Sequence, residues 1–477
     1  MMPIIELREP QTDGTPPMDR WLEAALDYIP SWLEFQLRLS RQPGCVVAVA
    51  HRGEIVLERA FGHADCLNGE ALTPRHRFRV ASLSKSVTAA GVMKLREQGR
   101  LRLDDRVGRY LAGLHPIIAQ ATISQVLSHG AGLFRDGVDY GYFAGRRPYP
   151  DTQELLADFK TPPAIEPDTR FKYSNHGFGL LGLVMEAVTG ESYRSWIKRE
   201  IIDAVGLAET VPDMPVAADA PFARGHTDEL LLGRRGLIAG DYTTGALVPA
   251  SGCVSTAADM ARFFGQLSPS SERSVISLES RREMTRRLRR NPHSSVEIYY
   301  GLGIISGEVD GWNWFGHSGG LPGYVTRSKV LPDQDLAVCV LTNAVDGLAE
   351  LWINGAIHIL HAFRQRGAPS VEVNGWKDRW WTVWGAVDLV PMGELVLVAN
   401  PHLAKPFGDA SELQVTGRDT ARIALASGFF NHGEGAHRKR DDSGRITELW
   451  LAGDKLLPQS ALAAEVEQQY IDAFGHP

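Results

Sequence analysis

The run Ser82-Leu83-Ser84-Lys85 places a nucleophile and a base within reach of each other. It follows a strand-like run at 78–81 and opens an apolar segment of helical spacing that ends at Gly99. Residues three apart lie on the same helix face, one turn from each other. A lysine in a dry site loses its charge more readily, and the neutral amine can take a proton from a serine hydroxyl. The spacing therefore predicts a Ser-Lys acyl-transfer site.

A purely structural role for Ser82 is the alternative, since serine is favoured as the N-cap of a helix. A second copy of the pattern, Ser195 to Lys198, lies inside an amphipathic helical run at 193–202 with no strand before it. We interpret that copy as a chance match, because a short motif needs the right structural context to carry chemistry.

Tyr173-Ser174-Asn175 is the only Tyr-x-Asn in the chain. A phenol beside a lysine ammonium is shifted toward phenolate, and it can then carry the serine proton to a leaving group. The amide of Asn175 can hydrogen-bond to lysine, tyrosine or substrate. The alternative is a turn asparagine before a helix, with Tyr173 as an ordinary core residue.

His317-Ser318-Gly319-Gly320 lies between two runs that read as strands, at 300–305 and 336–341. Small residues after the histidine would let a substrate backbone approach the strand edge closely. The backbone N–H of Gly320, paired with that of Ser82, could form an oxyanion hole. The alternative is a glycine-rich hairpin turn that carries a surface histidine.

The three motifs, in this order, resemble those of the serine β-lactamase and penicillin-binding-protein superfamily. More closely, the chain resembles the class C β-lactamase-like branch, with its esterases, D-aminopeptidases and DD-peptidases, which uses Tyr-x-Asn where other branches use Ser-x-Asn. The resemblance extends over residues 25–360 and includes the segments 44–62, 95–110, 123–133 and 249–260.

The resemblance implies an α+β fold, in which an antiparallel sheet flanked by helices carries a helical insertion. It implies an N-terminal tail at 1–24 and a catalytic domain at 25–365, with the insertion at about 105–250 and the site in the cleft between the two parts. No cofactor and no metal are expected. The site residues that it implies are Ser82, Lys85 and Tyr173 as catalytic residues, and Asn175, His317, Gly319 and Gly320 as substrate-binding residues.

His317 bears on the kind of substrate. Many β-lactamases carry lysine at its position, a lasting cation suited to a substrate carboxylate, whereas histidine is mostly neutral at pH 7. The expected function is therefore a serine hydrolase that acts through a Ser82 acyl-enzyme on peptide, amide or ester bonds of a small substrate, with D-amino acids among the candidates. A transacylase of a small metabolite, and a non-catalytic binding protein that kept the fold, are the alternatives.

Short apolar or alternating runs, separated by turn residues, fill residues 366–457. This pattern predicts a small antiparallel β-barrel. It resembles the lipocalin-like C-terminal domain of some peptidases and esterases of the same superfamily. A final helix is expected at 458–477.

The composition fits a soluble enzyme. The 477 residues are 44% hydrophobic and 22% charged, and their net charge of −7 argues against binding to nucleic acid. No apolar run reaches the roughly 18 residues of a membrane span. Four cysteines without a zinc pattern, and no signal peptide visible in residues 1–17, predict a cytoplasmic protein with reduced thiols. The expected partner is a small-molecule or short-peptide substrate, and a homo-oligomer is left open.

Overall fold

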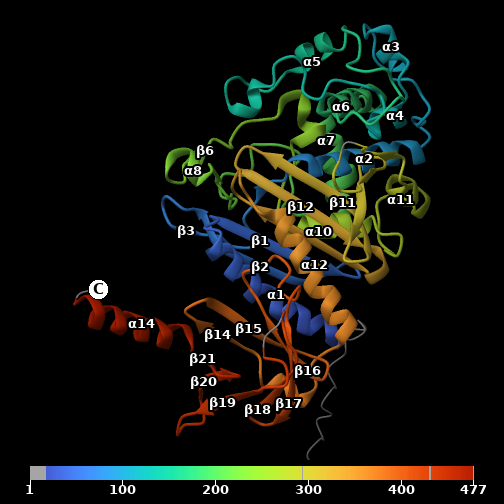
Figure 1. The fold of residues 1–477 in the computed structure, drawn as a ribbon. Helices are drawn as coiled ribbons and strands as arrows, with labels where there is room; N and C mark the ends of the chain where they lie inside the picture. Colours follow the sequence, from blue (N-terminus) through green and yellow to red (C-terminus); the bar gives the residue numbers. More distant parts are fainter. Residues whose placement is uncertain (1–17, 293, 429–430, 476–477) are drawn as a thin grey trace, which may run out of the picture. The chain divides into compact units, whose positions relative to one another are not determined.

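The computed structural model describes residues 18–292, 294–428 and 431–475, which form two compact units (Figure 1). The larger unit runs from Trp32 to His358, and the smaller unit combines the described residues up to Ser31 with those from Ile359 onward. Each unit has its own sheet and its own hydrophobic core. Residues 1–17 of the predicted tail, with the region where a signal peptide would lie, fall outside the described residues, as do residues 476–477.

The larger unit is built on a nine-stranded antiparallel sheet in the order β3-β2-β1-β13-β12-β11-β10-β9-β8. Strand β13 is buried along its whole length and β1 along nearly all of it, so both are continuous apolar runs rather than alternating ones. The strands are β1 (Gly44–His51), β2 (Glu54–Asp65), β3 (Glu70–Ala71), β8 (Arg289–Arg290), β9 (Tyr299–Tyr300), β10 (Ile305–Val309), β11 (Trp312–Leu321), β12 (Tyr324–Leu331) and β13 (Leu336–Thr342).

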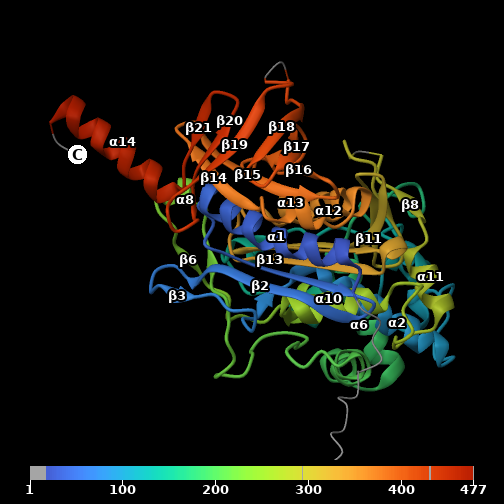
Figure 2. The same ribbon diagram turned by 90° about the horizontal axis from the view of Figure 1, so that it is seen from below.

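Helices cover both faces of this sheet. Helix α10 (Ala257–Gln266) packs against one face, and the part of α1 (Arg20–Leu39) that belongs to the larger unit lies on the other (Figure 2). The first half of α12 (Ala349–Arg366) also belongs to the larger unit.

A helical part lies between β4 (Phe78–Arg79) and β7 (Val254–Ser255), two short strands that pair with each other. Its centre is formed by α2 (Ser84–Glu97), α6 (Asn175–Thr189) and α9 (Val248–Ser251), which pack on one another. Gly182 in α6 permits its close packing on α9, since a Cβ there would overlap with the Pro249 side chain. The shorter helices of this part are α3 (Pro116–Ala119), α4 (Ile123–Leu127), α5 (Thr152–Asp158), α7 (Tyr193–Ile197) and α8 (Glu229–Leu232), and β5 (Gly225–His226) pairs with β6 (Leu237–Ile238). Helix α11 (Leu278–Thr285) comes later in the chain, between α10 and β8.

The smaller unit contains eight antiparallel strands, each paired with the next in sequence. An isolated bridge between Trp381 and Leu457 nearly closes them into a barrel, whose buried core includes Trp376, Trp380 and Leu413. The predicted α+β fold and the predicted C-terminal barrel are thus confirmed. The strands are β14 (Asp378–Thr382), β15 (Gly385–Met392), β16 (Leu395–Ala399), β17 (Ser411–Gly417), β18 (Thr420–Leu425), β19 (Gly435–Arg440), β20 (Ile446–Leu451) and β21 (Asp454–Leu456), accompanied by α13 (Val371–Asn374) and α14 (Gln459–Phe474).

Candidate active site

Ser82 lies in a single 3-10 turn, Ala81–Leu83, that leads directly from β4 into α2. Ala81 takes φ 54°, a left-handed conformation that costs a non-glycine residue about 1 kcal/mol. This sharp turn leaves Ser82 partly exposed, while the residues on either side of it are buried. Ser82 is the N-cap of neither helical segment, since Val80 and Leu83 hold those positions. Ser82 therefore does not act as a helix N-cap.

Lys85 is completely buried at the start of α2. Its Nζ lies 3.0 Å from Oγ of Ser82, 2.6 Å from Oδ1 of Asn175 and 2.9 Å from the carbonyl oxygen of Ala250 in α9. Burial lowers the pKa of Lys85 well below its ordinary value, and the nearby carboxylate of Asp136 only partly opposes this. The predicted pairing of a serine with a lysine in a dry site is present.

Tyr173 stands over the same lysine, with Nζ of Lys85 4.9 Å from the centre of its ring. Burial raises the pKa of the Tyr173 phenol, and a hydrogen bond with Ser82 only partly opposes this shift. The expected shift toward phenolate is therefore wrong. It assumed a lysine ammonium beside the phenol, and the dry surroundings that favour a neutral Lys85 also favour a neutral phenol.

Asn175 is the first residue of α6 and is buried. The preceding Ser174 caps the helix by accepting a hydrogen bond from the backbone N–H of Gly177, 2.8 Å away. The Asn175 side chain turns inward, where Oδ1 accepts from Lys85 and Nδ2 donates to Oδ1 of Asp136 at 2.5 Å. Asn175 thus begins a helix and also belongs to the site.

His317 is buried on β11 and is not a surface residue of a hairpin turn. Its Nδ1 lies 2.7 Å from the carbonyl oxygen of Ser318, which can only accept, so the proton is on Nδ1. Nε2 then accepts from the hydroxyl of Tyr300 at 2.9 Å. Burial lowers the pKa of His317 to about 3, and Lys85, whenever it is protonated, acts in the same direction. His317 is therefore neutral at pH 7.

Gly319 allows β11 to lie directly against the chain that leads to Ser82. A Cβ at this position would overlap with the carbonyl oxygen of Val80 and the hydroxyl of Thr326. That hydroxyl also ties β12 to the same segment, because it donates to the Val80 oxygen at 2.9 Å. Gly320 is exposed, with open space where its Cβ would be. The strand edge is thus available beside the serine.

Three residues of the site were not assigned a role from the sequence. His129 lies in the segment 123–133, and its ring packs at a tilt against the rings of Tyr173 and Tyr300, at centroid distances of 4.3 and 4.6 Å. Its Nδ1 accepts from the backbone N–H of Ser174 at 3.2 Å. Tyr300, which ends β9, is the hydrogen-bond partner of His317, and Asp136 is that of Asn175. Asp136 lies in no motif, so only the folded chain identifies it.

The second Ser-x-x-Lys has a different environment. Ser195 in α7 hydrogen-bonds to the hydroxyl of Ser192 at 2.8 Å, and Lys198 pairs with Asp203 at the surface. The serine and the lysine of this copy therefore have partners other than each other. The second copy is thus an internal control for the first, because it has the same spacing but its serine and lysine do not pair.

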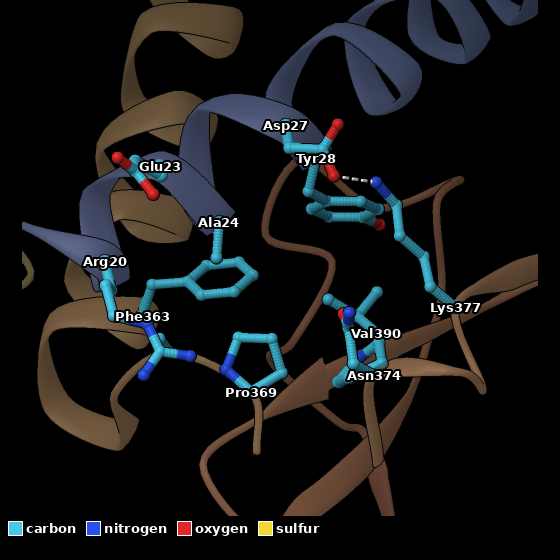
Figure 3. A pocket seen from close by; sticks show the side chains of 12 residues that line it. Arg20, Glu23, Ala24, Asp27, Tyr28, Phe363, Pro369, Asn374, Lys377 and Val390 are labelled. Carbon is cyan, nitrogen blue, oxygen red and sulfur yellow. Dashed lines mark hydrogen bonds and ion pairs between the residues drawn. The ribbon is translucent and has the colours of Figure 1, made fainter. Parts of the chain in front are cut away.

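Two cavities lie away from Ser82. One, of about 350 Å³, belongs to the smaller unit (Figure 3), and two of its lining residues, Lys377 and Asp27, pair with each other. The other, of about 520 Å³, belongs to the larger unit and includes Arg38 and Cys66 in its wall. Neither is lined by a residue predicted for the site.

Among the described residues there is no cluster of three or more His, Cys, Asp or Glu side chains that could hold a metal ion. In those same ranges, no helix has the length and apolar character needed to span a membrane. All four cysteines have free thiols.

The mixed fold, with a Ser-Lys pair at the start of a buried helix and a glycine-rich strand beside it, defines the class of β-lactamase-like and penicillin-binding-protein-like folds. The chain belongs to the Beta-lactamase family, whose family model matches residues 33–355. The resemblance seen in the motifs is thereby confirmed.

Two relatives illustrate the range of similarity. Penicillin-binding protein 4 of Amycolatopsis lactamdurans is 28% identical over 317 residues, which are 63% of this chain and 81% of the relative. Penicillin-binding protein 4* of Bacillus subtilis (strain 168) is 33% identical over 171 residues, or 34% of this chain. That match spans only 37% of the Bacillus protein.

Solved structures share the fold at low sequence identity. The octameric penicillin-binding protein homologue from Pyrococcus abyssi has a TM-score of 0.63 and 22% identity, over 91% of this chain and 100% of that one. The D-amino acid amidase from Ochrobactrum anthropi SV3, complexed with L-phenylalanine amide, has a TM-score of 0.60 and 21% identity, over 71% and 99%. The likeness concerns the fold alone.

Proposed function

We propose that this protein is a serine hydrolase that forms an acyl-enzyme at Ser82 on peptide, amide or ester bonds of a small substrate. The observation that carries the proposal is the position of the Lys85 amine, 3.0 Å from the Ser82 hydroxyl and enclosed by two carbonyl oxygens. A nucleophile and a base within hydrogen-bond reach of each other are the signature of covalent catalysis.

The hydrogen-bond partners of Lys85 determine the direction of the first proton transfer. A neutral amine carries two N–H groups and one lone pair. The oxygens of Asn175 and Ala250 can only accept, so they take the two N–H groups. The lone pair then points at Ser82, removes its proton and frees Oγ to attack the substrate carbonyl. The backbone N–H groups of Ser82 and Gly320 are proposed to stabilise the resulting oxyanion.

Collapse of the tetrahedral intermediate requires a proton for the leaving group. Tyr173, as a neutral phenol beside Ser82, is proposed to donate that proton and to regain one from the Lys85 ammonium. The products of this half-reaction are the Ser82 ester and the free amine or alcohol, with Lys85 neutral again. Water then attacks the ester by the same proton route in reverse and releases the acid.

Amides and esters of D-amino acids are the proposed substrate class. The neutral imidazole of His317 supplies no lasting cation for a substrate carboxylate, unlike a lysine at that position. Two solved structures that share the fold are of a D-amino acid amidase and of a D-stereospecific amidohydrolase from Streptomyces, and these descriptions support the choice.

Assembly, location and domain division also belong to the proposal. The octameric state of the Pyrococcus abyssi homologue supports a homo-oligomer. Four free thiols support a cytoplasmic location. The division into a catalytic domain at 25–365, a barrel at 366–457 and a helix at 458–477 remains a prediction.

Turnover of a panel of D- and L-amino-acid amides and esters tests the proposal. Ser82→Ala should lower kcat by roughly a thousandfold or more on any substrate that is turned over. Ser195→Ala, which changes the serine of the second motif, should leave kcat unchanged. Turnover retained in Ser82→Ala would overturn the proposal.

A further inference from the structure

The carboxylate of Asp136 determines which end of the Asn175 amide faces Lys85. Asp136 Oδ1 lies 2.5 Å from Nδ2 of Asn175, and its Oδ2 lies 3.2 Å from Nε of Arg135. An ionised carboxylate can only accept hydrogen bonds, so the amide must present its NH₂ group to Asp136. Its oxygen is then left for Lys85, in agreement with the 2.6 Å contact to Nζ.

The opposite orientation of the amide would disturb the base. An asparagine amide has nearly the same shape in both orientations. If the NH₂ group of Asn175 faced Lys85, the amine lone pair could accept from it. That lone pair would no longer be directed at the Ser82 hydroxyl. The acceptor on the far side of the amide is therefore as important as the amide itself.

The backbone holds Asp136 in this place. The carbonyl oxygen of Arg135 accepts from the backbone N–H of Asn175 at 2.8 Å and from that of His176 at 3.2 Å. The hydroxyl of Ser174 donates to the carbonyl oxygen of Phe134. The loop at 134–136 is thus fastened to the first turn of α6. The Asp136 side chain is only 11% exposed.

We propose that Asp136 is a positioning residue that fixes the orientation of the Asn175 amide and thereby directs the Lys85 lone pair at Ser82. This inference rests on the proposed function and deepens it. Asp136 acts through Asn175 and is assigned no contact with substrate.

The charges around Lys85 make the inference testable by pH. The titratable groups that face Lys85 come from several elements. Asp136 carries a negative charge, which favours the ammonium, and Arg135 carries a positive charge, which disfavours it. Removing the Asp136 charge should therefore lower the pKa of Lys85 further and extend activity to more acidic pH. The facing groups are Asp136 and Arg135 from the loop, His129 after α4, Tyr173 before α6 and His317 on β11.

The test is the rate at which a fluorophosphonate labels Ser82, measured from about pH 5 to 9 for the wild type and Asp136→Asn. The side-chain amide in Asp136→Asn has the same shape as the carboxylate, but it can either accept or donate a hydrogen bond. It therefore no longer fixes the orientation of the Asn175 amide. We expect the labelling rate on the pH plateau to fall about tenfold or more. We also expect the acid limb of the profile, where the rate decreases as the pH falls, to move to lower pH. Asp139→Asn is the matched control and should match the wild type, because Asp139 lies three residues further along the chain, is exposed and accepts from the Gly141 N–H.

The exchange variant Asp136→Asn/Asn175→Asp provides a second test of the role of Asp136. Its carboxylate at 175 would accept from Lys85 on one side and from the new amide on the other, which restores the hydrogen-bond directions. The negative charge now touches Lys85, so the acid limb should move to higher pH, opposite to the single variant. This second result stays informative if the single variant folds poorly.

Two outcomes would overturn the inference while leaving the proposed function intact. One is an Asp136→Asn variant that is labelled at the wild-type rate with the same pH profile. The other is a loss of rate with an unmoved acid limb, as a merely structural role would give. A folded wild type that is not labelled at all would instead contradict the proposed function, and this inference with it.

Discussion

At the scale of single residues, the chemistry depends on which groups are charged. Lys85, His317 and Tyr173 all lie where burial favours their neutral forms. A neutral lysine is a base, a neutral phenol is a proton donor and a neutral imidazole is no anchor for a carboxylate. These three states are mutually consistent because they have one cause, the dry surroundings of the site.

The buried imidazole of His317 should make stability depend on pH. Its folded-state pKa of about 3 lies below the ordinary 6.5. As the pH falls from 6.5 toward 3, the unfolded chain takes up a proton that the folded chain does not, so stability is lost. By pH 5 the loss amounts to about 2 kcal/mol.

His317→Gln should remove this loss, since its amide can still accept from Tyr300 and donate to the Ser318 oxygen. Denaturant unfolding at pH 7 and pH 5 measures the difference for both proteins. An equal loss of stability in the two would contradict the assignment.

The motif residues could be predicted from the sequence because their spacing is local. Ser82 and Lys85 are one helical turn apart, and Tyr173 and Asn175 flank the N-cap of α6. Asp136 could not be found in this way, because only the folded chain brings it to Asn175. The charge of Tyr173 was predicted wrongly, since it depends on the neutral state of another group.

At the scale of elements, the close approach of β11 to the 3-10 turn positions the strand edge beside Ser82. Gly319 permits this approach, because a side chain there would overlap with Val80 and Thr326. The sequence indicates small residues at this place but not their distinct roles. Gly319 lies against the chain before Ser82, whereas Gly320 faces open space.

Gly319→Ala should force β11 and the turn apart. We expect a loss of stability of about 1–3 kcal/mol and slower labelling of Ser82. Gly320→Ala, with nothing near its Cβ, should leave the stability unchanged. Denaturant unfolding of the two variants makes the comparison, and equal stabilities would contradict this role of Gly319.

At the scale of the whole molecule, the chain forms two compact units, and the candidate site belongs to the larger one. The side chains and the carbonyl oxygen that hold Lys85 lie within the unit from Trp32 to His358. The barrel has its own core and its own nearly closed sheet. A barrel could be predicted from its short strands and turn residues, because each strand pairs with its sequence neighbour.

A cavity in the barrel core should therefore destabilise one unit more than the other. Leu413→Ala removes a fully buried side chain, and the expected cost is about 2–5 kcal/mol. The unfolding curve should gain an earlier transition, before which the rate of Ser82 labelling stays at the wild-type value. A labelling rate that falls in the folded variant would contradict this independence.

The central claim is that Ser82 is an activated nucleophile, and the intact mass of the protein after exposure to a fluorophosphonate tests it most directly. We predict a single adduct on the wild type and on Ser195→Ala, and none on Ser82→Ala. An adduct that persists in Ser82→Ala, or a folded wild type without one, would contradict the account.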